Sequence, residues 1–180
     1  MKASVFVGTS VDGFIARPNG DLDFLSIGDS EPHGFEEFIA QIDTVVMGRK
    51  TFETVLSFIP PWPYGTKRVV VLSSTPLNLL TLPGIPKETV EQMSGPPSEV
   101  ITRLATSGAQ HLYIDGGITV QRFLRAGLIQ NLTITQVPIL IGQGIPLFGS
   151  LPNDLRLRHI ATRHYSNGLV QTQYEVIKHA

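Results

Sequence analysis

The chain has 180 residues, a mass of 19.7 kDa and 42% hydrophobic residues, which suits a single domain over residues 1–180 with a sizeable core. Its formal net charge of −1 and pI near 6.5 argue against binding to nucleic acid, and no apolar stretch is long enough to cross a membrane. The absence of cysteine excludes disulfides, a thiol nucleophile and a zinc–thiolate site.

The N-terminal part of the chain predicts one strand followed by a long loop. Residues 4–8 read as a strand, and the residues before it lack the pattern of a signal peptide, so we expect a cytoplasmic protein. A loop rich in Gly, Asp, Ser and Pro is expected over residues 9–32.

The next segment alternates between helix and strand. Apolar residues at helical spacing predict helices over residues 35–42 and 52–59, the second stopped by Pro60. Short β-branched runs at 45–47 and 69–72 predict strands that are buried on both faces of a parallel sheet.

Alternation continues into the second half of the chain. Residues 76–86 are expected to form a surface loop, and residues 89–93 a short strand. Pro97 should occupy the first position of a helix that ends at Gly108, since proline is favoured there. Residues 111–114 predict another buried strand, after which Thr119 is expected to cap a helix that reaches Leu128.

From residue 131 onward the pattern predicts only strands. They are expected over residues 132–140, 157–165 and 169–177. The turn between the last two contains Asn167-Gly168, the strongest short signal for a β-hairpin.

Small, basic and hydroxyl side chains follow three of the predicted parallel strands, at residues 48–51, 72–75 and 115–119. Ligands of open α/β sheets bind beyond the carboxyl ends of the strands. We therefore expect these three segments to form one extended anion site. The extended anion that fits best is a phosphorylated dinucleotide.

Each segment alone has a simpler explanation, as a strand-to-helix turn, a strand end with serines, or a tight turn at two glycines. Gly117 is expected to need a positive backbone angle there. The Gly-x-Gly-x-x-Gly fingerprint and the Walker A motif are both absent, and Gly142-Gln143-Gly144 reads as a loop. The three segments support one another because they fall at the same edge of one sheet.

At this point the chain resembles a known family. Residues 46–53 are similar to the segment after the second strand of dihydrofolate reductases, and residues 71–74 and 114–117 resemble that fold's two other cofactor segments. Residues 10–16 and 137–148 more closely resemble the reductase domain of bacterial riboflavin biosynthesis, the RibD C-terminal domain, and its stand-alone relatives.

This resemblance covers nearly the whole chain and implies an α/β, dihydrofolate-reductase-like three-layer fold. Its central sheet would be mostly parallel, with a C-terminal antiparallel hairpin. The resemblance also implies NADPH as cofactor, with phosphates at the second-strand turn, the 2′-phosphate side at the serines, the pyrophosphate at the glycine pair and the nicotinamide near the first strand. The implied cofactor-binding residues are Ile15, Ala16, Gly48, Arg49, Lys50, Thr51, Leu72, Ser73, Ser74, Gly116, Gly117, Ile118 and Thr119.

One departure from the folate reductases concerns the acidic residue that they carry on the first helix, about four positions before a phenylalanine. Counting back from the two phenylalanines of this helix gives Gly34 or Glu31. Glu36 and Glu37 flank the apolar stripe and are expected to be solvated. A folate substrate is therefore disfavoured, and the riboflavin-type relatives do not depend on that carboxylate.

Candidates for the substrate side follow the first strand. Asp12 could orient a heterocycle or relay a proton, or it could serve an Asp-Gly turn. Arg17 is a candidate phosphate contact, and Asp23 with Phe24 could contact a heterocycle or cap a turn. His33 reads as a surface or helix-start residue, and no His, Asp and Glu spacing predicts a metal site.

We therefore expect an NADPH-dependent reductase that delivers hydride to a small heterocycle. The favoured substrate class is the 5-amino-6-(5-phosphoribosylamino)uracil-type pyrimidine of riboflavin biosynthesis. The alternatives are a dihydrofolate reductase and a nucleotide-binding protein without catalytic activity.

A homodimer is also expected. Residues 137–148 are apolar and nearly uncharged, which is too hydrophobic for a solvated loop and typical of an interface. The riboflavin-type relatives associate through this part of the fold, and twofold symmetry is the commonest closed arrangement.

Overall fold

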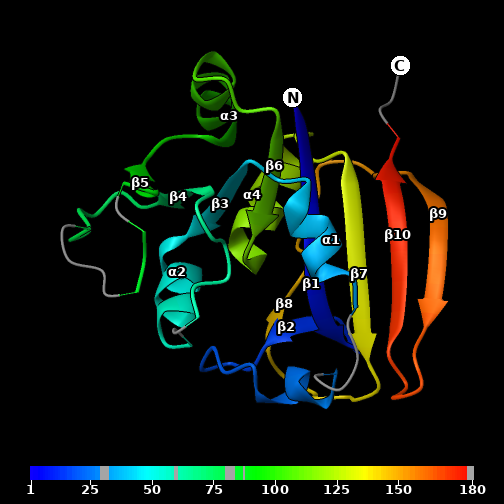
Figure 1. Cartoon of the computed structure of the whole chain (residues 1–180). Coiled ribbons are helices and arrows are strands. Elements are labelled where there is room, and N and C mark those ends of the chain that lie inside the picture. Colours follow the sequence, from blue (N-terminus) through cyan, green and yellow to red (C-terminus); the bar gives the residue numbers. More distant parts are fainter. Residues whose placement is uncertain (29–32, 59–60, 80–83, 87, 178–180) are drawn as a thin grey trace.

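The computed structural model describes residues 1–28, 33–58, 61–79, 84–86 and 88–177. Its centre is an eight-stranded sheet with the order β5-β4-β3-β6-β1-β7-β10-β9 (Figure 1). The strands are β1 (Lys2–Ser10), β3 (Thr44–Gly48), β4 (Arg68–Leu72), β5 (Val90–Met93), β6 (His111–Asp115), β7 (Asn131–Val137), β9 (Leu157–His164) and β10 (Val170–Val176).

The sheet has the predicted mixture of strand directions. All neighbouring pairs from β5 to β7 are parallel, whereas β10 is antiparallel to both β7 and β9. The hairpin between β9 and β10 turns at Gly168, which has φ +87° and donates its amide to the Tyr165 carbonyl at 3.0 Å. The predicted mostly parallel sheet with a C-terminal hairpin is thus confirmed.

Two apolar layers enclose the parallel strands. Alternate residues of a strand point to opposite faces, so β3 places Val46 on one face and Val45 and Met47 on the other. The first face packs against α3 (Pro97–Thr106) and α4 (Gly117–Arg125), and the second against α1 (Phe35–Ala40) and α2 (Arg49–Leu56). This double coverage explains why these strands read as unbroken apolar runs.

The segment expected to be one loop over residues 9–32 contains regular structure instead. β1 continues to Ser10, β2 (Phe14–Ala16) pairs with β8 (Ile145–Pro146) in a small second sheet, and a 3₁₀ helix, η1, spans Asp23–Gly28 (Figure 1). A three-residue strand and a 3₁₀ turn are too short to show a periodic pattern, which is why the sequence did not predict them.

Several predicted boundaries are also corrected. The first helix ends at Ala40 rather than 42, α2 ends at Leu56 rather than 59, and β7 ends at Val137 rather than 140. The predicted stop at Pro60 and part of the 76–86 loop lie outside the described residues. Thr119 does not cap its helix, because α4 begins at Gly117 with Gly116 as the N-cap residue.

Candidate functional site

The carboxyl ends of five neighbouring parallel strands line one cleft of about 1240 Å³. Adjacent strands lie about 4.8 Å apart, so the five ends from β5 to β1 span roughly 19 Å. Every one of the thirteen residues expected to bind the cofactor lines this cleft: Ile15, Ala16, Gly48, Arg49, Lys50, Thr51, Leu72, Ser73, Ser74, Gly116, Gly117, Ile118 and Thr119. The sequence segments predicted to converge are therefore brought together.

Two helix N-termini open into the cleft. Neither α2 nor α4 has a side-chain hydrogen bond to its first amides or an acidic residue in its first turn. The free amides and the helix dipole make such ends attractive to an anion. α2 adds Arg49 and Lys50 in its first turn, where positive side chains are unfavourable unless an anion is present.

The two helix N-termini are packed closely against each other through glycines. A Cβ on Gly116 would lie 2.2 Å from Oγ1 of Thr51 on α2, and a Cβ on Gly48 would lie 3.1 Å from Oγ1 of Thr119 on α4. A larger residue is therefore excluded at Gly116 and would force Thr119 to shift at Gly48, and the starts of both helices line the same cleft.

The glycine pair at the start of α4 differs in one respect from expectation. The positive backbone angle belongs to Gly116, with φ +87°, and not to Gly117. Gly117 is instead constrained by packing, because a Cβ there would lie 2.8 Å from Cδ1 of Ile15 and 3.2 Å from the Pro146 carbonyl oxygen. Its backbone is held against β2 and β8.

The end of the cleft at β4 and β5 combines hydroxyls with a cation that the sequence did not reveal. The Ser73 hydroxyl accepts the Thr75 amide at 3.2 Å and donates to the Thr75 carbonyl at 2.7 Å, while Ser74 is exposed. Arg122 reaches across from α4 and donates to the Gly95 carbonyl at 3.2 Å.

Ser94 and Gly95 follow β5 and line the same end, so a fourth strand end repeats the pattern of the other three. That repetition is a sequence signal that could have identified them. Arg49 lies nearby but is partly engaged, since its Nε donates to Glu53 at 2.7 Å one turn later on α2.

A carboxyl group lies in the floor of the cleft. Asp115 ends β6, and its Oδ1 accepts the Gly116 amide at 2.8 Å. Burial raises the pKa of Asp115 to about 6, although the hydrogen bond from Gly116 and the neighbouring Tyr113 hydroxyl act in the opposite direction. A cleft carboxyl that titrates near neutral pH is a candidate for holding a proton.

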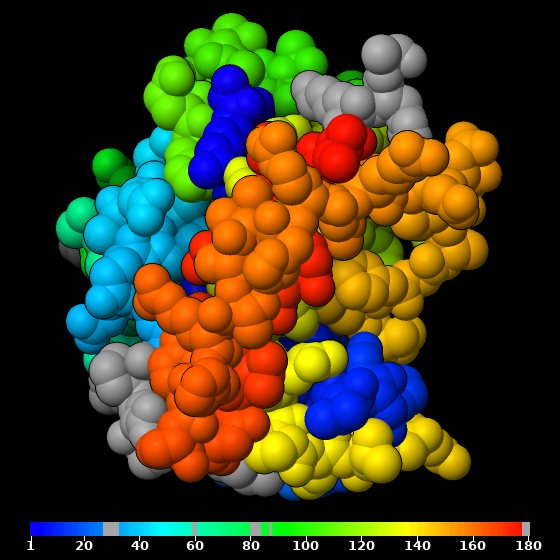
Figure 2. Space-filling model, turned by 90° about the vertical axis from the view of Figure 1, so that its right-hand side faces the viewer, coloured from blue at the N-terminus to red at the C-terminus, as the bar shows by residue number. Residues whose placement is uncertain are grey.

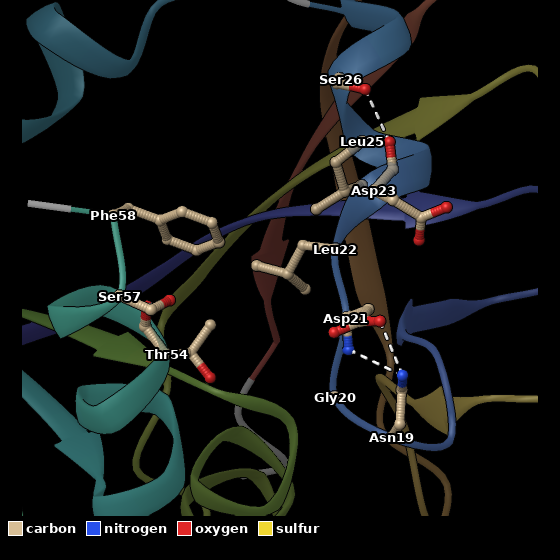
Figure 3. Close-up of a pocket in the computed structure, with 10 residues that line it drawn as sticks. All are labelled: Asn19, Gly20, Asp21, Leu22, Asp23, Leu25, Ser26, Thr54, Ser57 and Phe58. Atoms are coloured by element: carbon tan, nitrogen blue, oxygen red, sulfur yellow. Dashed lines mark hydrogen bonds between the residues drawn. The ribbon is translucent and has the colours of Figure 1, made fainter.

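A second cavity of about 580 Å³, here called the side chamber, continues the cleft (Figure 3). Six of its ten lining residues also line the cleft. In Figure 3, Phe58 beyond the end of α2 faces Leu22 and Leu25 from the loop after β2 and from η1. The remaining lining residues are Asn19, Gly20, Asp21, Asp23, Ser26, Thr54 and Ser57.

The predicted substrate residues do not assemble into one group. Asp12 does not line the cleft or the side chamber; it accepts the amides of Gly142 at 2.8 Å and Ile141 at 3.3 Å. Hydrogen bonds, first from the Ser10 side chain and then from these amides, lower the pKa of Asp12 despite some desolvation. This position favours the alternative in which Asp12 serves the Asp-Gly turn and does not contact the substrate.

Arg17, Asp23 and Phe24 form a local unit instead. Arg17 donates to both carboxylate oxygens of Asp23, one of them at 2.9 Å, and its guanidinium lies 5.9 Å from the centroid of the Phe24 ring. Phe24 is buried in the core, with 2% exposure, so its ring is not available to a ligand. Of the three, only Asp23 lines the side chamber.

The other candidates lie away from the cleft. Glu36 and Glu37 are exposed, as predicted, and Glu31 lies outside the described residues. The His33 ring lies 6.4 Å from the Tyr165 ring. Within the described ranges, no three His, Asp or Glu side chains are arranged to hold a metal ion, and every helix is too short or too polar to traverse a lipid bilayer.

Comparison with known proteins agrees with this geometry. The model of the RibD C-terminal domain matches residues 2–171. An uncharacterized *Bacillus subtilis* (strain 168) protein, YwjB, is 30% identical over 175 residues, which cover 96% of this chain and 97% of that protein.

Two solved structures extend the comparison. A *Shewanella* sp. PV-4 protein with a provisional riboflavin-biosynthesis name is 39% identical, with a TM-score of 0.89 and coverage of 99% of this chain and 100% of that one. Dihydrofolate reductase from *Enterococcus faecalis*, solved with NADP(H), shares the fold at 18% identity, with a TM-score of 0.66 and coverage of 98% and 97%. The chain belongs to the RibD C-terminal domain family.

Proposed function

We propose that the protein binds NADPH in the cleft and transfers hydride to a small heterocycle held in the side chamber. The observation that carries this proposal is the convergence of five strand ends and two uncapped helix N-termini on one cleft that opens into the side chamber, where Leu22, Leu25 and Phe58 form an apolar surface. The cleft suits an extended phosphorylated molecule, and the cavity suits a compact ring.

The residues of the cleft fit the proposed cofactor. The amides at the N-termini of α2 and α4 would hold the pyrophosphate, where a Cβ at Gly116 or Gly117 has no room. Ser73, Ser74 and Arg122 would hold the 2′-phosphate side, together with Arg49. When bound, the cofactor supplies the hydride.

The protein's own task is to position the two molecules and to manage a proton. Ile15 and Ala16 lie in the cleft near β8 and would exclude water from the nicotinamide side. Asp115 would hold a proton in the floor of the cleft, since its raised pKa keeps the acid form populated near pH 6.

The finer substrate assignment depends on the family alone. Reduction of a 5-amino-6-(5-phosphoribosylamino)uracil-type pyrimidine is supported by membership in the RibD C-terminal family and by the similar *Shewanella* protein. Dihydrofolate remains an alternative, but no α1 carboxylate reaches the cleft among the described residues. A non-catalytic nucleotide-binding protein is the third candidate, and oxidation of NADPH with a panel of heterocycles separates it from the other two.

A cofactor titration tests the proposal directly. We expect NADPH to bind at least about tenfold more tightly than NADH, equivalent to about 1.4 kcal/mol. Arg122→Ala should reduce this preference, because it removes a charge beside the serines. Arg125→Ala is the matched control: it lies on the same helix but outside the cleft, where its Nε donates to the Ser150 carbonyl. Equal affinities for NADPH and NADH in the wild type would refute the assignment of a 2′-phosphate site.

We further propose that the protein is a homodimer that associates through the face shown in Figure 2. Leu140 and Phe148, from the predicted interface segment, are 71% and 46% exposed, whereas Val137 and Leu147 are buried in the core. β9 crosses the same face beside this segment (Figure 2), and its Leu157 and Ile160 are among the exposed apolar residues. Light scattering should give twice the 19.7 kDa chain mass, and a monomer at micromolar concentration would exclude this interface.

A further inference from the structure

The two halves of the combined cavity carry opposite charge. The cleft is lined by three cations at the proposed phosphate sites, Arg49, Lys50 and Arg122, and by two acids, Glu53, which is paired with Arg49, and Asp115 in its floor. Among its described lining residues, the side chamber has only two charged side chains, Asp21 and Asp23, and no Lys or Arg.

The sequence around the side chamber shows the same contrast. Residues 18–28, which form the loop after β2 and η1, contain Asp21 and Asp23 and no Lys or Arg. Residues 51–66, which include the other wall of the side chamber, contain Glu53 and again no Lys or Arg.

Two cations of the neighbouring segments, Arg17 and Lys50, are not among the residues that line the chamber. Arg17 and Asp23 neutralise each other through two hydrogen bonds, and the Asp23 carboxylate points away from Phe58 in Figure 3, so the negative charge of the lining rests mainly on Asp21. Lys50 lies four residues before Thr54 on α2, about 6 Å along the axis. Lys50 lines the cleft and not the chamber, in keeping with the lean of helical side chains toward the helix N-terminus.

Helix α2 adds partial negative charge to the side chamber. The chamber is lined by Thr54, Ser57 and Phe58, at and just beyond the C-terminal end of this helix. The carbonyl groups at a helix C-terminus carry partial negative charge, which favours cations and repels anions. A phosphate or carboxylate in the chamber would meet this charge as well as Asp21.

We propose that the substrate is an unphosphorylated heteroaromatic compound that is neutral or positively charged. This inference depends on the proposed function, since it takes the side chamber as the substrate site beside the cofactor. Leu22, Leu25 and Phe58 supply apolar contact for a flat ring, and Asn19, Thr54 and Ser57 supply hydrogen bonds at its edge. The ribose phosphate of the pyrimidine named above and the glutamate tail of a folate would meet no lining Lys or Arg there, so the chamber disfavours both of these anionic substrates, although family membership alone suggests the first.

Matched ligand pairs test the proposal on the NADPH-saturated protein. The pairs are 5-amino-6-ribosylaminouracil with its 5′-phosphate, and pterin with 6-carboxypterin, measured by calorimetry at about 10 mM and about 1 M salt. We expect the member without the anionic group to bind at least about tenfold more tightly at low salt, with a smaller ratio at high salt. Equal or tighter binding of the anionic members, or binding of none of the four, would overturn the proposal.

A charge reversal locates the effect. Asp21→Lys should improve binding of the anionic members by about tenfold at low salt, because it replaces a repulsive charge in the chamber with an attractive one. Asp154→Lys makes the same change of net charge at an exposed position outside both cavities and is the control. Equal effects of the two variants would show that the ligands bind elsewhere and would overturn the proposal.

Failure of the cofactor assignment can be distinguished from failure of the proposal on substrate charge. NADPH binding is measured first, without any substrate compound. If NADPH does not bind, the proposed function fails, and the ligand pairs are then compared on the protein alone, where the same ratio decides the charge preference of the chamber.

Discussion

Replacement of Asp115 by asparagine should stabilise the folded protein relative to the wild type, and this gain should be larger at pH 8 than at pH 4. The folded protein raises the pKa of this carboxyl from 3.8 to about 6, chiefly by burial. The folded state therefore binds a proton more tightly than the unfolded state, and stability is lost as pH rises from about 4 to about 6. Above that range the cost of the buried charge is fully present.

The size of the effect follows from the same shift. A change of one pKa unit corresponds to about 1.4 kcal/mol, so the ionised Asp115 lowers the free energy of unfolding by about 3 kcal/mol above pH 6. This value is an upper bound because Asp115 is partly open to the cleft. Asparagine has no charge and still offers an oxygen to the Gly116 amide, so the variant removes the cost and keeps the hydrogen bond. The midpoint of thermal unfolding should rise by several degrees at pH 8.

Urea unfolding of wild type and variant at pH 4, 6 and 8 measures this difference. Asp43→Asn provides a control of opposite sign. Although burial acts to raise the pKa of Asp43, hydrogen bonds from Thr44 and from the His111 and Gln110 amides hold it below its ordinary value. That carboxylate stabilises the fold above about pH 4, so its loss should cost most at pH 8. If Asp115→Asn is pH-independent, the carboxyl is not buried as described.

Three further substitutions probe the cleft. Gly117→Val should weaken NADPH binding at least tenfold and cost about 1–3 kcal/mol of stability, because its side chain would overlap Ile15. Normal NADPH binding by this variant would show that the glycine serves only the turn. Asp12→Asn should lower the urea midpoint of unfolding only slightly and leave turnover almost unchanged, because it weakens the acceptor of the Ile141 and Gly142 amides; a large loss of turnover would instead place Asp12 on the substrate side. Lys50→Glu should raise the unfolding free energy of the ligand-free protein by about 0.5–1 kcal/mol while weakening NADPH binding. An increase in both stability and NADPH affinity would contradict the anion site.

The sequence predicted those parts of the molecule that depend on regular structure. The runs at Val45–Met47 and Val69–Val71 are apolar because both faces of their strands are covered, so they could be recognised as central strands. Once the strands are known, the direction of a parallel sheet places their following residues at one edge. The residues at 48–51, 72–74 and 116–119 could be predicted to line one cleft for this reason, with no knowledge of side-chain positions, whereas Ile15 and Ala16 were expected there only from the family resemblance.

The substrate side follows from contacts that local sequence does not encode. Asp12 is held by amides 129 and 130 residues later in the chain, and Arg17 is matched to Asp23 by the geometry of a short irregular loop. Arg122 enters the cleft only because α4 brings it to Gly95 after β5. No periodicity marks these residues, since their positions depend on tertiary structure.

Helix α2 connects the two halves of the cavity and explains why they can differ in charge. Its first turn carries Arg49 and Lys50 without a side-chain cap, an arrangement that lowers stability unless an anion binds there. Its last turn, with Thr54, faces the side chamber and presents partial negative charge. One short helix thus attracts an anion at one end and repels it at the other. A dinucleotide and a neutral or cationic ring would each be matched to one end, so that changes in the loop after β2 can alter the substrate while the phosphate sites stay intact.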